Sequence, residues 1–144
     1  MAKIKVDLPE HFSFTTTIPI RITDVNYGKH VGNDAILSII HEARMQFLKS
    51  YGLAELEFAG IGLIMRDVGI EFKSELFYGD IVTVSVTAGE FSNISFDIFY
   101  KLVTSEKDGK ETIGAIAKTG MVGYDYQKKK IATLPERAKN SLSA

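Results

Sequence analysis

The sequence contains no cysteine, no tryptophan and only three prolines. Without cysteine the chain cannot form a disulfide framework, a thiolate zinc site or a cysteine nucleophile. Its 17 basic and 18 acidic side chains give a formal net charge of −1, so no overall field attracts nucleic acid or an anionic membrane. No apolar run approaches the length of a membrane span, and the first dozen residues lack a signal-peptide pattern. We therefore expect a cytoplasmic protein that binds neither nucleic acid nor membrane.

The composition that remains is typical of a globular protein, with 45% hydrophobic and 24% charged residues. A chain of 144 residues is long enough to bury a core without disulfides or metal, and neither repeats nor a linker interrupt it. We expect one domain over residues 1–144. With three histidines and no cysteine, the sequence indicates no metal site and no other cofactor.

Hydrophobic periodicity predicts one long helix and five strands. The helix is expected over residues 34–51, with Asn33 or Asp34 as N-cap and Gly52 at the C′ position. Strands are expected over 12–22, 61–72, 80–87, 94–103 and 111–126, with a hairpin turn at 107–110 and a short helix after Pro135. One strand, a helix and four further antiparallel strands predict an α+β fold in which a curved five-stranded sheet wraps around the helix.

The loop before this helix carries the side chains best suited to chemistry. Asp24, Asn26 and His30 lie within seven positions, and Gly28 and Gly32 punctuate the loop. The loop leads into a helix N-terminus, where free backbone N–H groups favour developing negative charge. Such an arrangement can polarise a carbonyl group and direct a water molecule at it.

Three separated stretches carry a resemblance to hotdog-fold thioesterases of the 4-hydroxybenzoyl-CoA thioesterase-like group. Residues 24–44 are similar to the family pattern Asp-x-Asp-x-x-Gly-His-Val-Asn-Asn followed by a helix that contains Glu-Ala-Arg. Residues 72–80 resemble the family's turn that ends in Gly-Asp before a strand, and residues 125–136 resemble its Lys-rich turn before Leu-Pro-Glu. The resemblance covers most of residues 12–137. It implies the hotdog fold and hydrolysis of an acyl-CoA or acyl carrier protein thioester.

The resemblance also implies a homodimer or homotetramer that binds the thioester between subunits. Gly32 and Asn33 are implied to bind the substrate, with the backbone N–H of Asn33 directed at the thioester carbonyl. The exposed edge of a single curved sheet independently predicts at least a dimer, because an unpaired edge needs cover. Lys73 and Arg66 are candidates for contact with CoA phosphates, although simple solvation is the favoured explanation for charges in these positions.

The sequence departs from the family at Asn26, because the family's working carboxylate occupies this register. An amide can orient a water molecule but can neither accept its proton nor attack as a carboxylate. Asp24, His30 and Glu42 are the candidates to replace it. Glu42 lies roughly 13 Å along the helix from Asn33 at about 1.5 Å per residue, so it could serve only from another subunit. We therefore predict that Asp24, Asn26 and His30 form the catalytic group.

Two alternatives remain open at this point. The order Asp24, Asn26, His30 resembles the Asp-x-Asn-Pro-x-His motif of hotdog enoyl-CoA hydratases, but Tyr27 replaces the proline and one extra residue precedes His30. In the second alternative, Asn26 marks a hotdog protein that binds an acyl thioester without hydrolysing it.

Overall fold

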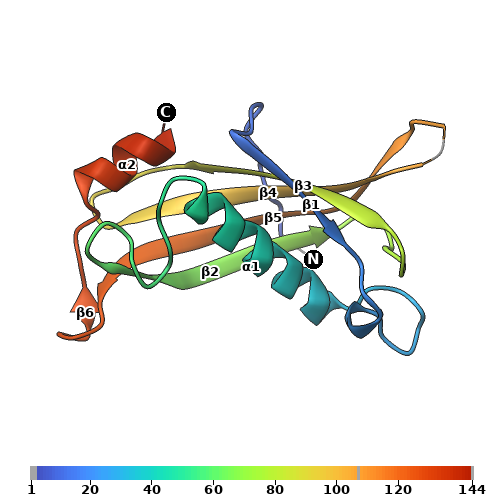
Figure 1. Ribbon diagram of the computed structural model, residues 1–144, viewed down its shortest axis with the longest axis horizontal. Helices are drawn as coiled ribbons and strands as arrows, with labels where there is room; N and C mark the ends of the chain where they lie inside the picture. The colour runs from blue at the N-terminus through green and yellow to red at the C-terminus, as the bar shows by residue number, and fades with distance from the viewer. Residues whose placement is uncertain (1–2, 107, 144) are drawn as a thin grey trace.

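The computed structural model describes residues 3–106 and 108–143, and one curved antiparallel sheet wraps around a long helix (Figure 1). The elements in chain order are β1 (Phe14–Pro19), the 3₁₀ turn η1 (Ile22–Asp24), α1 (Asn33–Lys49), β2 (Gly62–Phe72), β3 (Ile81–Gly89), β4 (Ser95–Ser105), β5 (Glu111–Asp125), β6 (Lys130–Ile131) and α2 (Glu136–Ser143). The predicted α+β class, the five long strands and the short C-terminal helix are confirmed. The two-residue strand β6 was not predicted.

The strands follow the order β1-β3-β4-β5-β2, and β6 pairs with β5 off this path. Strands β1 and β2 are therefore the two edges, which explains why Pro19, with no N–H to donate, is tolerated in β1. A bulge between Met65 and Asp67 interrupts the pairing of β2 with β5. In the predicted hairpin turn, Gly109 adopts a φ of 85° and its N–H donates to Glu106 O, whereas Lys107 lies outside the described residues.

Helix α1 differs from its predicted bounds at both ends. It begins at Asn33 with Gly32 as N-cap, so the prediction of Asn33 or Asp34 as N-cap was wrong. It ends at Lys49, two residues earlier than predicted, and Gly52 reverses the chain with a φ of 73°. The helix buries one face against the concave side of the sheet. The residues that form this interface include Ile36, Ile40, Ala43 and Phe47 of α1 and Val82, Val84, Val86, Phe96, Ile98 and Ala117 of the sheet.

A buried polar cluster fixes α1 to the sheet and to the segment before β2. Arg44 Nε donates to Glu55 Oε1 at 2.7 Å, and its Nη1 donates to the hydroxyl of Tyr100 at 3.3 Å. That hydroxyl also lies 2.7 Å from the hydroxyl of Thr119. Burial opposes the charge of Arg44, but Tyr100 and Glu55 together outweigh it and raise the pKa of the guanidinium. Burial likewise raises the pKa of Tyr100, so both groups keep their ordinary protonation at neutral pH.

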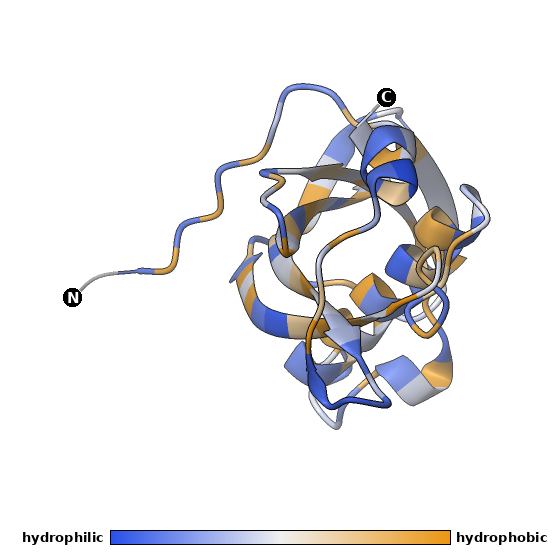
Figure 2. Cartoon of the chain, turned by 90° about the vertical axis from the view of Figure 1, so that its left-hand side faces the viewer, coloured by the Kyte–Doolittle hydropathy of each residue, from blue (hydrophilic) through white to orange (hydrophobic). Residues whose placement is uncertain are grey.

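Residues 3–12 form an N-terminal arm on the side of the sheet opposite α1 (Figure 2). The N–H of Val6 donates to Glu71 Oε2 at 2.7 Å, and the side chains of Ile4 and Val6 lie over Gly69 of β2. The bond from Val6, with the nearby ammonium of Lys73, lowers the pKa of Glu71. Over the described residues, no helix combines the length and the apolar character that crossing a membrane demands.

Candidate active site

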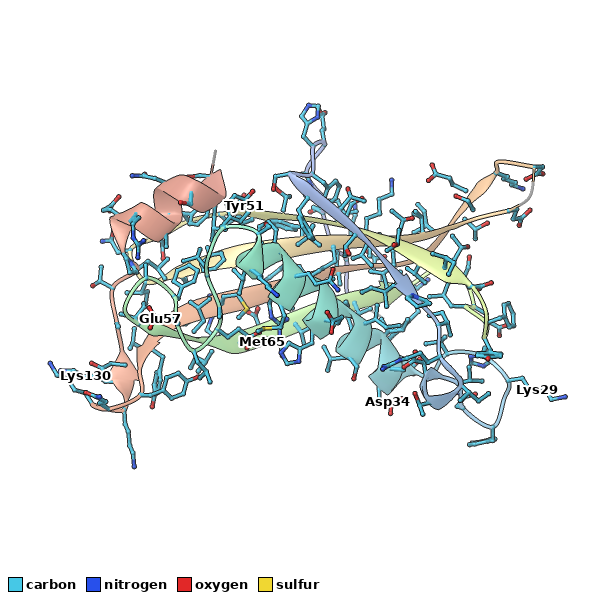
Figure 3. All side chains as sticks on the ribbon, viewed as in Figure 1. Lys29, Asp34, Tyr51, Glu57, Met65 and Lys130 are labelled. Atoms are coloured by element: carbon cyan, nitrogen blue, oxygen red, sulfur yellow. The ribbon has the colours of Figure 1, made fainter. Side chains whose placement is uncertain are left out.

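The loop between η1 and α1 closes on itself through backbone hydrogen bonds. The N–H of Gly32 donates to Asp24 O at 3.2 Å, and the N–H of Asn26 donates to His30 O at 3.0 Å. Lys29 adopts a φ of 69°, which lets the chain reverse between these two bonds. The closed loop therefore lies at the N-terminal end of α1, where Figure 3 labels Lys29 of the loop and Asp34 of the first helical turn.

Asp24 is buried, and its carboxylate faces Arg21. Its Oδ2 accepts from the backbone N–H of Arg21 at 2.9 Å and from Arg21 Nε at 3.4 Å, while Oδ1 lies 3.3 Å from Nη2. Both carboxylate oxygens are thus engaged in holding the 3₁₀ turn. This geometry favours a positioning role for Asp24, because a carboxylate with both oxygens engaged is less available to take a proton from water.

The amide of Asn26 has a defined orientation. Its Oδ1 accepts from the N–H of Gly28 at 2.8 Å, which closes an Asx turn and assigns the oxygen. The Nδ2 group consequently lies on the side of Gly32, 3.8 Å from where a Cβ at that glycine would be. Asn26 therefore brings a hydrogen-bond donor near the start of α1, where Oδ1 of Asp34 lies closer still, 2.7 Å from the same point.

The first turn of α1 offers free donors. Gly32 provides no capping side chain, and its own N–H and carbonyl are bonded to Asp24 and Ile36. Among residues 3–106 and 108–143, the N–H of Asn33 has no hydrogen-bond acceptor. This group and the positive end of the helix dipole are available to an oxygen atom that gains negative charge.

His30 lies beside these donors and lines a small cavity of about 230 Å³. Its Nδ1 is 3.2 Å from the carbonyl oxygen of Val31, and its Nε2 is 3.3 Å from where a Cβ at Gly28 would be. The cavity is walled by three segments that lie far apart in sequence. The lining residues are His30, Val31, Asn33 and Ile36 on one side and Phe72, Lys73, Ser74, Glu75, Leu76 and Gly114 on the other.

The second wall contributes a carboxylate that sequence reasoning missed. Glu75 Oε1 lies 3.9 Å from His30 Nε2. The backbone beside these two residues is tied together, because the N–H of Val31 donates to Leu76 O at 2.8 Å. The turn after β2 was noted for its Gly-Asp ending, but no periodicity or spacing indicates that it meets the loop before α1.

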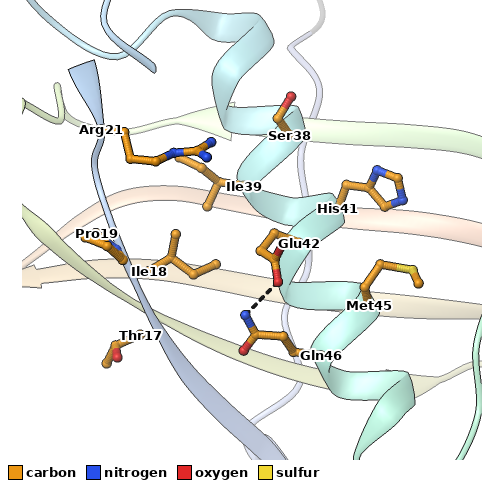
Figure 4. A pocket seen from close by; sticks show the side chains of 10 residues that line it. All are labelled: Thr17, Ile18, Pro19, Arg21, Ser38, Ile39, His41, Glu42, Met45 and Gln46. Atoms are coloured by element: carbon orange, nitrogen blue, oxygen red, sulfur yellow. Dashed lines mark hydrogen bonds between the residues drawn. The ribbon is translucent and has the colours of Figure 1, made fainter. Parts of the chain in front are cut away.

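Glu42 lies in a different cavity, of about 420 Å³, between α1 and the edge strand β1 (Figure 4). Its Oε2 accepts from Gln46 Nε2 at 2.7 Å. This cavity and the one beside His30 share no lining residue, so within one chain the structure separates Glu42 from the loop group as expected. Lys73 lines the cavity of His30 but forms its ion pair with Glu71 at 3.1 Å.

No three His, Asp or Glu side chains gather as metal ligands in the part of the chain that the structure describes. The site therefore consists of an imidazole, an amide donor, a free helix N–H and a nearby carboxylate. Such a set can stabilise an oxyanion and accept a proton from water.

A family model described as the thioesterase-like superfamily matches residues 20–142 of the sequence. The chain belongs to the thioesterase-like superfamily. The match includes the loop, α1, the turn after β2 and the strands β2, β3, β4 and β5, whereas the edge strand β1 lies before it. A comparison with curated proteins gives no significant match.

Solved structures confirm the hotdog fold predicted for this superfamily member. The 1,4-dihydroxy-2-naphthoyl-CoA thioesterase from Synechocystis is 22% identical, with a TM-score of 0.79 over 90% of this chain and 95% of that chain. An aspartate-to-asparagine mutant of 4-hydroxybenzoyl-CoA thioesterase, complexed with 4-hydroxybenzoyl-CoA, is 16% identical, with a TM-score of 0.82 over 90% and 97%. A Staphylococcus aureus protein in complex with CoA is 19% identical, with a TM-score of 0.79 over 96% and 86%.

Proposed function

We propose that this superfamily member hydrolyses an acyl thioester of CoA or of acyl carrier protein to a free acid and a thiol. The observation that carries the proposal is the meeting of three groups at the start of α1: the imidazole of His30, the amide donor of Asn26 and the unbonded N–H of Asn33. Membership of the thioesterase-like superfamily and the fold of the CoA-ester thioesterases support the same reaction.

In the proposed reaction the thioester carbonyl lies at the N-terminus of α1, beside Gly32 and Asn33. A water oxygen forms a bond to the carbonyl carbon while one water proton passes to His30 Nε2. The electron pair of the C=O π bond moves to oxygen, where the N–H of Asn33 and Nδ2 of Asn26 stabilise the negative charge. The intermediate then expels the thiolate by breaking the C–S bond. The proton on His30 passes to sulfur, which gives the acid and the thiol and restores the imidazole.

The roles assigned to the loop follow from its contacts. His30 is the proposed proton acceptor, since Asp24 is engaged by Arg21 and Asn26 cannot accept a proton. Asp24 holds the turn from which the loop starts. In the assembly we propose a homodimer or homotetramer, because β1 and β2 both present unpaired edges in the single chain.

Release of thiol from a panel of short, long and aromatic acyl-CoAs tests the proposal. His30→Gln should lower kcat by about 10²- to 10⁴-fold, the usual contribution of a general base. His11→Gln, the same change at an exposed histidine outside the site, is the matched control and should leave kcat unchanged. Binding of CoA esters without thiol release by the unaltered protein would contradict hydrolysis. Conversion of an enoyl-CoA to its hydroxyacyl product would instead support the hydratase alternative.

A further inference from the structure

Glu75 is the carboxylate closest to the proposed base, and the fold rather than the sequence order places it there. Its Oε1 lies 3.9 Å from His30 Nε2, and both side chains line the same cavity. The N–H of Val31 donates to Leu76 O at 2.8 Å, so the residues that follow His30 and Glu75 are joined through the backbone. The proximity of the two side chains is therefore built into the meeting of two chain segments.

The contacts of His30 determine which ring nitrogen carries the proton and which carries the lone pair. A carbonyl oxygen can only accept a hydrogen bond, so the 3.2 Å contact with Val31 O places a proton on Nδ1. In the neutral imidazole Nε2 then carries the lone pair, and this is the atom near Glu75. Both Nε2 and the carboxylate oxygen are acceptors, and neither can donate to the other.

The distance between these two acceptors suits a shared water molecule. A separation of 3.9 Å is too long for a direct hydrogen bond. A water that donates one proton to each of two acceptors, at about 2.8 Å each, holds them roughly 4.4 Å apart. Glu75 is 63% exposed at its side chain, so a small rotation closes the difference. A water held in this way directs its lone pairs away from both acceptors.

We propose that Glu75 and His30 together hold the hydrolytic water, and that Glu75 is a catalytic residue supplying the carboxylate that Asn26 lacks. This inference rests on the proposed thioester hydrolysis. One water proton passes to His30 Nε2 as the water oxygen bonds to the carbonyl carbon. The other proton stays on that oxygen and donates to Glu75 Oε1, which remains ionised and stabilises the imidazolium formed beside it.

The neighbouring charges leave Glu75 available for this role. Lys73, two residues away and in the same cavity wall, directs its ammonium at Glu71 at 3.1 Å. Within the described ranges, His30 is the one basic side chain at ion-pair distance from Glu75. The proposed role of Glu75 also accounts for the amide at position 26. Because Glu75 supplies a carboxylate from the cavity wall, Asn26 can donate a hydrogen bond to the oxyanion instead.

The test compares kcat and KM for thiol release by the unaltered protein, Glu75→Gln and Glu111→Gln, using the best acyl-CoA of the panel. Glu75→Gln should lower kcat by about 10- to 100-fold and change KM less than about threefold. The reason is that the substitution removes a charged hydrogen-bond acceptor of the water and no contact of the thioester. The exposed Glu111 is the matched control, and its variant should behave as the unaltered protein. Glu75→Asp, which keeps the charge but withdraws it by about 1.5 Å, should be intermediate.

A second comparison introduces Asn26→Asp into the unaltered protein and into the Glu75→Gln variant. The new carboxylate should restore part of the rate lost in Glu75→Gln. In the protein that retains Glu75 it should lower the rate, because the substitution removes the Nδ2 donor proposed to stabilise the oxyanion. Such non-additivity is expected of two groups that serve one water.

The outcomes separate this inference from the proposed function. An unchanged kcat in Glu75→Gln, or a rise in KM alone, would overturn the role of Glu75 while hydrolysis stands. Equal effects of Asn26→Asp in both backgrounds would overturn it too. Absence of thiol release from the unaltered protein would overturn hydrolysis and, with it, this role.

Discussion

Removal of Glu55 should show how strongly the buried guanidinium of Arg44 depends on one partner. Glu55→Ala deletes the acceptor that lies 2.7 Å from Arg44 Nε and leaves Tyr100 as the remaining bonded side chain. Arg44 is 5% exposed, so water cannot replace the lost carboxylate without opening the contact between α1 and the sheet. The backbone bond from the N–H of Leu63 to Glu55 O is unaffected by the substitution.

The expected loss of stability can be worked out from this geometry. Breaking a buried ion pair by deleting one partner costs about 3–5 kcal/mol, because the other charge stays buried and unpaired. Glu55 is 23% exposed at its side chain, and solvent screening at this end reduces the expected cost to about 2–4 kcal/mol. Unfolding of a chain of 144 residues has an entropy of about 0.3 kcal/mol/K, so the Tm should fall by about 7–13 °C.

Urea and thermal unfolding followed by circular dichroism measure this loss. Adding Arg44→Met to Glu55→Ala removes the stranded charge and fills its volume, so the double variant should be more stable than Glu55→Ala alone. Glu57→Ala, two residues away at an exposed position, is the control and should cost about 1 kcal/mol or less. A loss below about 1 kcal/mol for Glu55→Ala, or a further loss on adding Arg44→Met, would refute the reasoning.

Three further outcomes follow from single contacts. Because the pKa of Glu71 is lowered in the folded chain, its ionised carboxylate stabilises the N-terminal arm above the ordinary glutamate pKa, and this stabilisation is lost as the pH falls through the folded pKa. Cleavage of the arm by an acid-tolerant protease should therefore accelerate below about pH 4.5. Glu71→Gln should show fast cleavage already at neutral pH. Gly114→Ala would place a Cβ 2.7 Å from Leu76 Cδ2, so it should cost about 1–3 kcal/mol in urea unfolding and reduce thiol release, since Leu76 O anchors the site loop. Lys129 has a φ of 54°, and Lys129→Gly should stabilise the chain by up to about 1 kcal/mol, whereas Lys128→Gly in the same turn should bring no gain in Tm.

The helix and the strands could be predicted from the sequence because each depends on a pattern of hydrophobic residues over a few neighbouring positions. Val82, Val84 and Val86 alternate with polar residues, and all three are buried on the inner face of β3 as the period of two requires. The apolar face of α1 followed from helical spacing in the same way. The exact start of α1 could not be predicted in this way, because Gly32 occupies the N-cap position by its backbone conformation and not by a capping side chain.

The location of the predicted loop group follows from the sequence, whereas the orientation of its side chains does not. The loop group of Asp24, Asn26 and His30 lies at the start of α1, where consecutive sequence positions had to place it. The direction of each side chain was not readable, since Asp24 turns toward Arg21 and the oxygen of Asn26 toward Gly28. These orientations depend on hydrogen bonds that compete at short range, and several are compatible with the same residue spacing.

By itself the sequence determined the strands, the helix and the glycine-punctuated loop in front of it, with Asp24, Asn26 and His30 in that loop. Only the tertiary structure decided that Glu75 lies 3.9 Å from His30, that Arg44 reaches Glu55 and Tyr100, and that Glu42 faces a separate cavity. Local patterns follow from backbone geometry over a few residues. The approach of Glu75 to His30, 45 positions apart in the chain, follows from the way the sheet curves around α1, and no local pattern contains it.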